Sequence, residues 1–195
     1  MDANSLSRRL RPAGKLARAR LIRRFAASNR GATAVEFALI AVPFFGLILV
    51  TLQIALVLWA TQILETAVAN ASRQLYTGEF QNSASNAGKT PAQLQQAFKD
   101  LVCGNVVGVF DCPSMVSVDV RTFSGFSGAT ATSPITNGAY DTSNYAYQAP
   151  SRNDIVVVRA SMQFPNYASI FSPATTLANG YQLIMATAAF RAEPF

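Results

Sequence analysis

The sequence predicts an α+β protein: a long apolar N-terminal helix, followed by a small antiparallel-sheet head with one short helix. Three observations predict this fold class. An uncharged apolar run extends from Phe37 to Ala60, one short helical pattern follows it, and three later segments alternate apolar with polar residues. A chain of 195 residues is long enough for one domain plus appendages, and too short for two large domains.

Basic residues are concentrated at the N-terminus. Residues 1–30 contain nine of the 16 Arg and Lys residues and one of the ten acids, so this segment has a net charge of +8. Residues 31–195 then have seven basic and nine acidic residues, a net charge of −2. We therefore interpret residues 1–31 as a basic cytoplasmic leader, and we expect no nucleic-acid binding by the protein as a whole.

The apolar run from Phe37 to Ala60 predicts a membrane-spanning helix. Its 24 uncharged residues extend over roughly 36 Å at 1.5 Å per residue, enough to cross a hydrocarbon core of about 30 Å. The run lacks the polar face that a core helix of a soluble protein shows. We place the transmembrane helix at residues 32–61, and Pro43 predicts a kink or a local loosening within it.

Beyond Trp59 the pattern becomes amphipathic, so the helix is expected to continue outside the membrane over residues 62–77. It should end near Tyr76, with Gly78 as its stop. Its apolar residues recur at helical spacing at Leu64, Ala67, Val68, Ala71 and Leu75. The arginines before the apolar run place the N-terminus in the cytoplasm and the head, residues 78–195, outside it.

The head is expected to contain one short helix and three strands. Residues 79–90 are polar and predict a loop, after which Thr90 caps and Pro91 opens a helix that reaches Val102. Alternating residues predict strands at 115–123, 154–164 and 181–192, with a loop or hairpin at 124–138. The Ala and Met content of the last strand is also compatible with a helix, but its position after Asn179-Gly180 favours a strand.

The side-chain chemistry argues against an enzyme. Histidine is absent, which removes the commonest general base and metal ligand. No nucleophile elbow, Walker loop or dinucleotide glycine pattern occurs, and Asp100, Asp111 and Asp119 lack the spacing of a calcium loop. Cys103 and Cys112 have no second ligand pair to complete a zinc site. We expect no cofactor or metal, and a Cys103–Cys112 disulfide if the head faces an oxidising compartment, with two buried free thiols as the alternative.

The segment N-R-G-A-T-A-V-E-F, residues 29–37, places the carboxylate of Glu36 at the start of the apolar run. A carboxylate costs roughly 2.5–3.5 kcal/mol at the centre of a membrane helix and less near its edge. The small residues Gly31 and Ala32 precede the apolar run, whereas a signal peptide carries its cleavage site after it. A protease that cuts before the run, at the cytoplasmic face, would remove the arginines and keep the helix as an anchor.

The run R-G-A-T-A-V-E-F-A-L-I-A-V-P-F-F, residues 30–45, resembles the N-terminal signature of TadE-like pseudopilins of the type IV pilin superfamily. The resemblance is closest over residues 30–60, and T-A-A-F-R-A-E-P-F at the C-terminus is loosely similar to the family's usual ending. It implies cleavage by a prepilin peptidase between Gly31 and Ala32, which makes Glu36 the fifth residue of the mature chain and Phe37 the sixth. The first mature residue, Ala32, replaces the phenylalanine of typical type IV pilins, as is common in the Tad-type branch.

Cleavage would create an α-ammonium group on Ala32 four residues before Glu36, on the same helical face. The carboxylate would also gain from the helix dipole, typically 0.3–1 kcal/mol. The pair could form within one molecule or between subunits, and the resemblance favours the intersubunit pair, with Glu36 and Phe37 as assembly residues. The alternative is that Glu36 reaches the lipid headgroups and has no role in assembly.

The resemblance implies a pseudopilin or minor pilin of a Tad-type (tight adherence, Flp) pilus machine. Its expected partners are the prepilin peptidase, companion pseudopilins, the major Flp-type pilin and the inner-membrane pilus platform. We expect it in the bacterial inner membrane with a periplasmic head, and then in the extracellular pilus. The 164 residues left after cleavage favour an accessory role in initiation, tip formation or adhesion. The alternative is an uncleaved single-pass protein whose outer head binds a ligand or an envelope partner.

Overall fold

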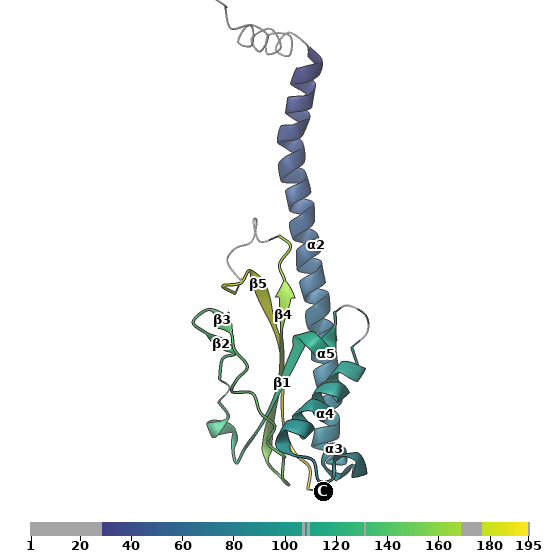
Figure 1. Cartoon of the computed structure of the whole chain (residues 1–195), viewed down its shortest axis with the longest axis vertical. Helices are drawn as coiled ribbons and strands as arrows, with labels where there is room; N and C mark the ends of the chain where they lie inside the picture. The colour runs from purple at the N-terminus through teal and green to yellow at the C-terminus, as the bar shows by residue number, and fades with distance from the viewer. Residues whose placement is uncertain (1–28, 107, 109, 131, 169–176, 195) are drawn as a thin grey trace, which may run out of the picture. The chain divides into compact units, whose positions relative to one another are not determined.

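The computed structural model describes residues 29–106, 108, 110–130, 132–168 and 177–194 (Figure 1). It divides into two compact units, residues 1–48 and 49–195, which are described separately. Most of the expected basic leader, residues 1–28, lies outside the described residues.

Helix α2 extends over Asn29–Tyr76 and contains Pro43. It ends at the residue expected from the sequence, and Gly78 follows with a φ of 76°, a left-handed conformation that glycine adopts without steric cost. The helical assignment is continuous on both sides of Pro43, and the kink stays a prediction. In the first unit, α2 exposes its large apolar side chains. These are Val35, Phe37, Leu39, Ile40, Val42, Phe44, Phe45, Leu47 and Ile48.

The second unit contains an antiparallel sheet with the strand order β1-β4-β5, beside the C-terminal half of α2 (Figure 1). Its strands are β1 (Val116–Phe123), β4 (Ile155–Pro165) and β5 (Tyr181–Arg191). All three strands expected from alternation are therefore confirmed, including the last one, for which a helix was the alternative. The central strand β4 pairs along its length with both neighbours.

One face of this sheet forms the core with α2 and with helix α4 (Pro91–Gly104). Alternate strand positions, such as Val118 and Val158, point to the same face, as the pleat requires. They pack with the apolar stripe of α2 that was read from the sequence, namely Leu64, Ala67, Val68, Ala71 and Leu75, all of which are fully buried or nearly so. The amphipathic half of α2 therefore forms part of the hydrophobic core of the head.

The head contains more short helices than the one expected, since three lie among its described residues. Residues 79–90, expected as a loop, contain α3 (Glu79–Asn82) and the 3-10 turn η1 (Ala84–Asn86), and α5 (Cys112–Met115) precedes β1. In α3, Phe80 is buried against Phe98 and Tyr147, at ring-centroid distances of 5.5 and 5.8 Å. One aromatic anchor in a polar segment leaves no periodic pattern, so the sequence could not show this helix.

The helix expected from Thr90 and Pro91 is confirmed as α4. The Thr90 side chain accepts a hydrogen bond from the backbone N–H of Gln93, and the Gln93 side chain accepts one from the N–H of Thr90. This reciprocal pair is a capping box, which satisfies two donors that the helix start leaves open. It orients α4 so that Phe98 and Val102 reach the core.

The loop or hairpin expected at residues 124–138 ends in a hairpin of β2 (Ile135–Thr136) and β3 (Ala139–Tyr140), whose second strand lies just beyond the expected segment. Its two turn residues, Asn137 and Gly138, have φ angles of 52° and 78°. Two positive φ angles are what a type I′ turn requires, and Asn-Gly is its preferred sequence.

Candidate functional site

The expected processing site lies in the N-terminal described part of α2. Because the chain is helical from Asn29 onward, the peptide bond between Gly31 and Ala32 is helical, not part of an extended arm. Glu36 lies one turn after Ala32, and both side chains are exposed. Phe37 is 69% exposed, although it is fully apolar. These residues therefore form no contact-rich site within one chain.

Helix α2 is the one described helix that is long and apolar enough to cross a membrane, over Gly31–Tyr76. Its exposed apolar side chains continue into the second unit through Leu49, Leu52, Ile54, Leu58 and Trp59. A monomeric soluble protein rarely exposes such a contiguous apolar surface, which is typical of contact with lipid or with another helix.

Gln53 connects the apolar part of α2 to the head. It is 6% exposed, and its Nε2 donates to the carbonyl of Pro165 at 3.1 Å. Its Oε1 accepts from the backbone N–H of Tyr167 at 3.2 Å. The Gln53 amide thus pairs with one backbone carbonyl and one backbone N–H at the end of β4 and just after it.

Cys103 at the end of α4 and Cys112 at the start of α5 are joined by a disulfide, the pairing preferred from the sequence. Cys112 belongs to the buried core, and Cys103 packs against it. The bond links α4 to the turn that leads into β1, and so it has a structural position.

A buried ion cluster lies on the opposite face of the sheet, where the sequence indicated no site. Asp119 on β1 is fully buried and directly opposite Arg159 on β4. Its carboxylate accepts from Arg159 Nη2 at 2.6 Å, from Arg121 Nε at 2.8 Å and from the backbone N–H of Ala146 at 2.9 Å. Burying this carboxylate is tolerated because its oxygens receive three donors, two of them charged.

Ser161 continues this polar layer along β4. It is fully buried, and the hydroxyls of Tyr140 and Tyr145 lie 3.0 and 2.7 Å from its Oγ. The Arg159 guanidinium lies 5.4 Å from the centre of the Tyr145 ring. Burial raises the pKa of the Tyr145 hydroxyl above its ordinary value, so this group stays protonated and available as a donor.

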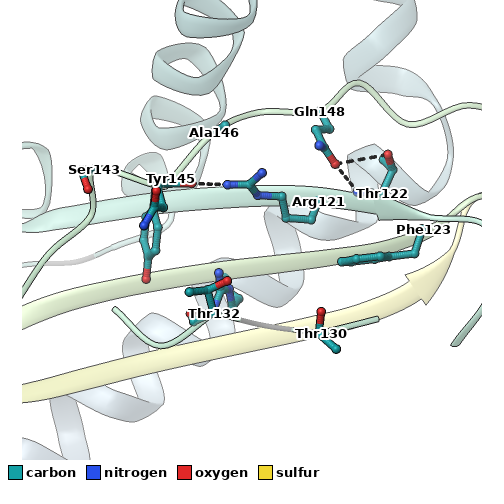
Figure 2. Close-up of a pocket in the computed structure, with 11 residues that line it drawn as sticks. Arg121, Thr122, Phe123, Thr130, Thr132, Ser143, Tyr145, Ala146 and Gln148 are labelled. Carbon is teal, nitrogen blue, oxygen red and sulfur yellow. Dashed lines mark hydrogen bonds between the residues drawn. The ribbon is translucent and has the colours of Figure 1, made fainter. Parts of the chain in front are cut away.

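Beside the cluster is a cavity of about 670 Å³, here called the head pocket. Figure 2 shows Arg121 on β1 extending toward the segment that carries Ser143 and Tyr145, and Gln148 bonded to Thr122. The described lining residues come from four segments of the head. They are Arg121, Thr122, Phe123, Thr130, Thr132, Ser143, Asn144, Tyr145, Ala146, Gln148 and Arg159.

The sequence-predicted residues and the residues that form this pocket are different sets. Gly31, Ala32, Glu36, Phe37 and Pro43 lie on the N-terminal part of α2, in the first unit. From the sequence, Asp119 was considered only as a calcium ligand and rejected on its spacing, and no role was predicted for Arg121, Arg159 or Gln53. The available signal was opposite charge in the middle of two expected strands, in V-S-V-D-V and V-V-V-R-A, where an unpaired charge is costly.

Comparison with known proteins gives a match for the N-terminal helix. No curated protein and no solved structure matches the chain. A family model does match, and the match covers most of α2, including Gly31, Ala32, Glu36 and Pro43, without reaching the sheet. Over residues 31–73, the chain is similar to the TadE-like protein family.

Proposed function

We propose that the protein is a pseudopilin or minor pilin of a Tad-type pilus machine. The observation that carries this proposal is the match of residues 31–73 to the TadE-like family. The matched segment starts at the Gly31-Ala32 pair, and its apolar side chains are exposed from Val35 onward. A helix with this surface needs lipid or other helices around it, and both environments are available to a pilin-like subunit before and after assembly.

In this proposal a prepilin peptidase cleaves between Gly31 and Ala32. Because the bond lies within the helical backbone of α2, the peptidase must unwind the helix locally to reach it. Gly31 weakens the helix at this point. The new ammonium group of Ala32 then lies one turn from Glu36, and in an assembly the carboxylate bonds the ammonium of a neighbouring subunit.

The head gives the subunit an accessory role, such as initiating, capping or modifying the pilus. It has its own core, a disulfide and a pocket, features that a segment serving only to pack helices does not need. The proposed location is the bacterial inner membrane, with the head in the periplasm and later on the pilus. The proposed partners are the companion pseudopilins, the major Flp-type pilin and the inner-membrane platform.

Intact-mass measurement of the protein purified from its native host tests the proposal directly. We expect a mature chain that begins at Ala32 and lacks the nine basic residues of the leader. A mass that corresponds to a chain starting at Met1, or to cleavage after the apolar run, contradicts it. An uncleaved chain would instead support a single-pass membrane protein whose outer head binds a ligand.

A further inference from the structure

The head pocket has the size of a small-molecule site and an excess of positive charge. Its volume of about 670 Å³ lies within the 300–1,000 Å³ typical of ligand pockets. Among the described lining residues, two guanidinium groups are present, from Arg121 and Arg159, and no carboxylate. Asp119 behind them neutralises one charge, which leaves an excess of one positive charge at the pocket.

Arg121 is the cation that a ligand can reach. Its side chain is 30% exposed, against 5% for that of Arg159. Its Nε donates to Asp119 and one Nη donates to the carbonyl of Asn144. These bonds use two of the five N–H groups of the guanidinium and hold its plane in place. A guanidinium held in this way is suited to pairing with a carboxylate through two parallel hydrogen bonds.

The rest of the lining offers partners for hydroxyl groups. Gln148 accepts from the Thr122 backbone N–H at 2.9 Å through Oε1, an arrangement that turns its amide NH₂ away from that bond. Hydroxyl side chains line the pocket at Thr122, Thr130, Thr132 and Ser143. Phe123 adds an aromatic ring at the end of β1, which the C–H face of a ligand can cover (Figure 2).

This lining excludes the other main ligand classes. An apolar ligand would leave the polar side chains without partners, a cost of about 1–3 kcal/mol for each buried group. A metal ion would find no carboxylate among the described lining residues, and the carboxylate of Asp119 behind them is already engaged by three donors. A nucleic acid needs several exposed cations along its phosphate backbone, and the described lining offers one exposed cation, Arg121.

We propose that the head pocket binds a carboxylate-bearing sugar, with Arg121 on the carboxylate and Gln148 and the hydroxyl side chains on the ring hydroxyls. Phe123 would stack against the apolar face of the ring. The same chemistry occurs in the uronic acids of polysaccharides and in sialic acids. The inference does not depend on processing at Gly31, because every residue it uses lies in the head.

Sugar binding can be measured by saturation-transfer NMR and calorimetry with the full chain in lipid nanodiscs. The probes are D-glucuronate and N-acetylneuraminate, which separate the two sources. D-glucose serves as the neutral twin of glucuronate, and acetate as a bare carboxylate. We expect at least one sugar acid to bind at least tenfold more tightly than glucose and acetate.

Matched variants assign the binding to the pocket. Arg121→Gln removes the cation, and Gln148→Glu keeps the acceptor for Thr122 but adds a negative charge, so each should weaken sugar-acid binding at least tenfold. Arg152→Gln removes an exposed arginine that does not line the pocket and should leave binding unchanged. Thermal unfolding of each variant identifies loss of fold, and Gln148→Glu decides the outcome if Arg121→Gln unfolds.

Several results would overturn the proposal. If neither glucuronate nor N-acetylneuraminate binds at about 10 mM, well above a Kd of ~1 mM, the pocket does not bind sugar acids and the proposal is wrong. Equal binding of glucose would remove the role of Arg121, and equal binding of acetate would reduce the site to a simple anion site. Unchanged binding in folded Gln148→Glu would place the sugar elsewhere.

Discussion

Glu36 is an exposed carboxylate in an otherwise apolar part of α2, and its role depends on what happens at Ala32. We predict that Glu36→Ala leaves cleavage intact and lowers co-purification of partner subunits by roughly tenfold, equivalent to about 1.4 kcal/mol. The physical reason is loss of the pair with a neighbouring α-ammonium group. Quantitative pull-down of the mature protein measures the effect.

The control for this prediction is Glu65→Ala, which removes another exposed carboxylate of α2, one bonded by Gln62 at 3.2 Å. It should assemble as the unmodified protein does. Normal piliation and normal co-purification of Glu36→Ala would mean that Glu36 only reaches the headgroups.

Two buried serines have opposite environments and so opposite predicted effects. Ser161 Oγ contacts two tyrosine hydroxyls, whereas Ser72 Oγ is buried with no hydrogen-bond partner among the described residues. Ser161→Ala should lower the free energy of unfolding by about 1–3 kcal/mol, because it leaves the half-buried Tyr145 hydroxyl without this partner. Ser72→Ala should be neutral or stabilising, and denaturant unfolding monitored by fluorescence distinguishes the two. Equal destabilisation by both substitutions would refute the assigned hydrogen bonds.

At the scale of elements, the side chain of Gln53 bonds the end of β4 to α2. Gln53→Leu preserves the apolar character of the helix and removes the bonds to Pro165 and Tyr167. We expect the Tyr167 amide to exchange with solvent roughly fivefold faster, which corresponds to about 1 kcal/mol for one hydrogen bond. Hydrogen–deuterium exchange of the segment after β4 is the measurement.

The matched control is Gln62→Leu, which changes the same residue type on an exposed position of α2. Exchange near Tyr167 should be unaffected in that variant. An equally slow Tyr167 amide in Gln53→Leu would show that other contacts hold the segment.

For the whole molecule, processing would reverse the sign of the net charge. The full chain has a net charge of +6, and removal of the +8 leader leaves −2. Isoelectric focusing of the protein from its native host should therefore show an acidic mature form. Gly31→Leu should block cleavage and keep the isoelectric point near that of the full sequence, about 9.7. A Gly31→Ala control keeps a small residue and should mature, whereas an acidic form of Gly31→Leu would place the cleavage elsewhere.

Much of the head could be predicted because its local patterns agree with its packing. The alternation in 115–123, 154–164 and 181–192 led to the three strands, and Thr90-Pro91 led to α4. The short helices α3 and α5 could not be predicted, since each has four residues and depends on one buried side chain, Phe80 or Cys112. Segments this short are stabilised by tertiary contacts, not by propensity.

Three features could be identified from the sequence alone: the apolar helix, the position of Glu36 after Gly31-Ala32, and the concentration of positive charge before them. These features depend on neighbours in the chain, so composition and spacing suffice to read them. The tertiary structure was needed to show that Asp119 meets Arg159 and Arg121, that Gln53 bonds the end of β4, and that Gln148 lines a pocket. Each of these contacts joins residues that are distant in sequence or depends on strand register, and a shift of one residue would turn the charged side chains to the other face of the sheet.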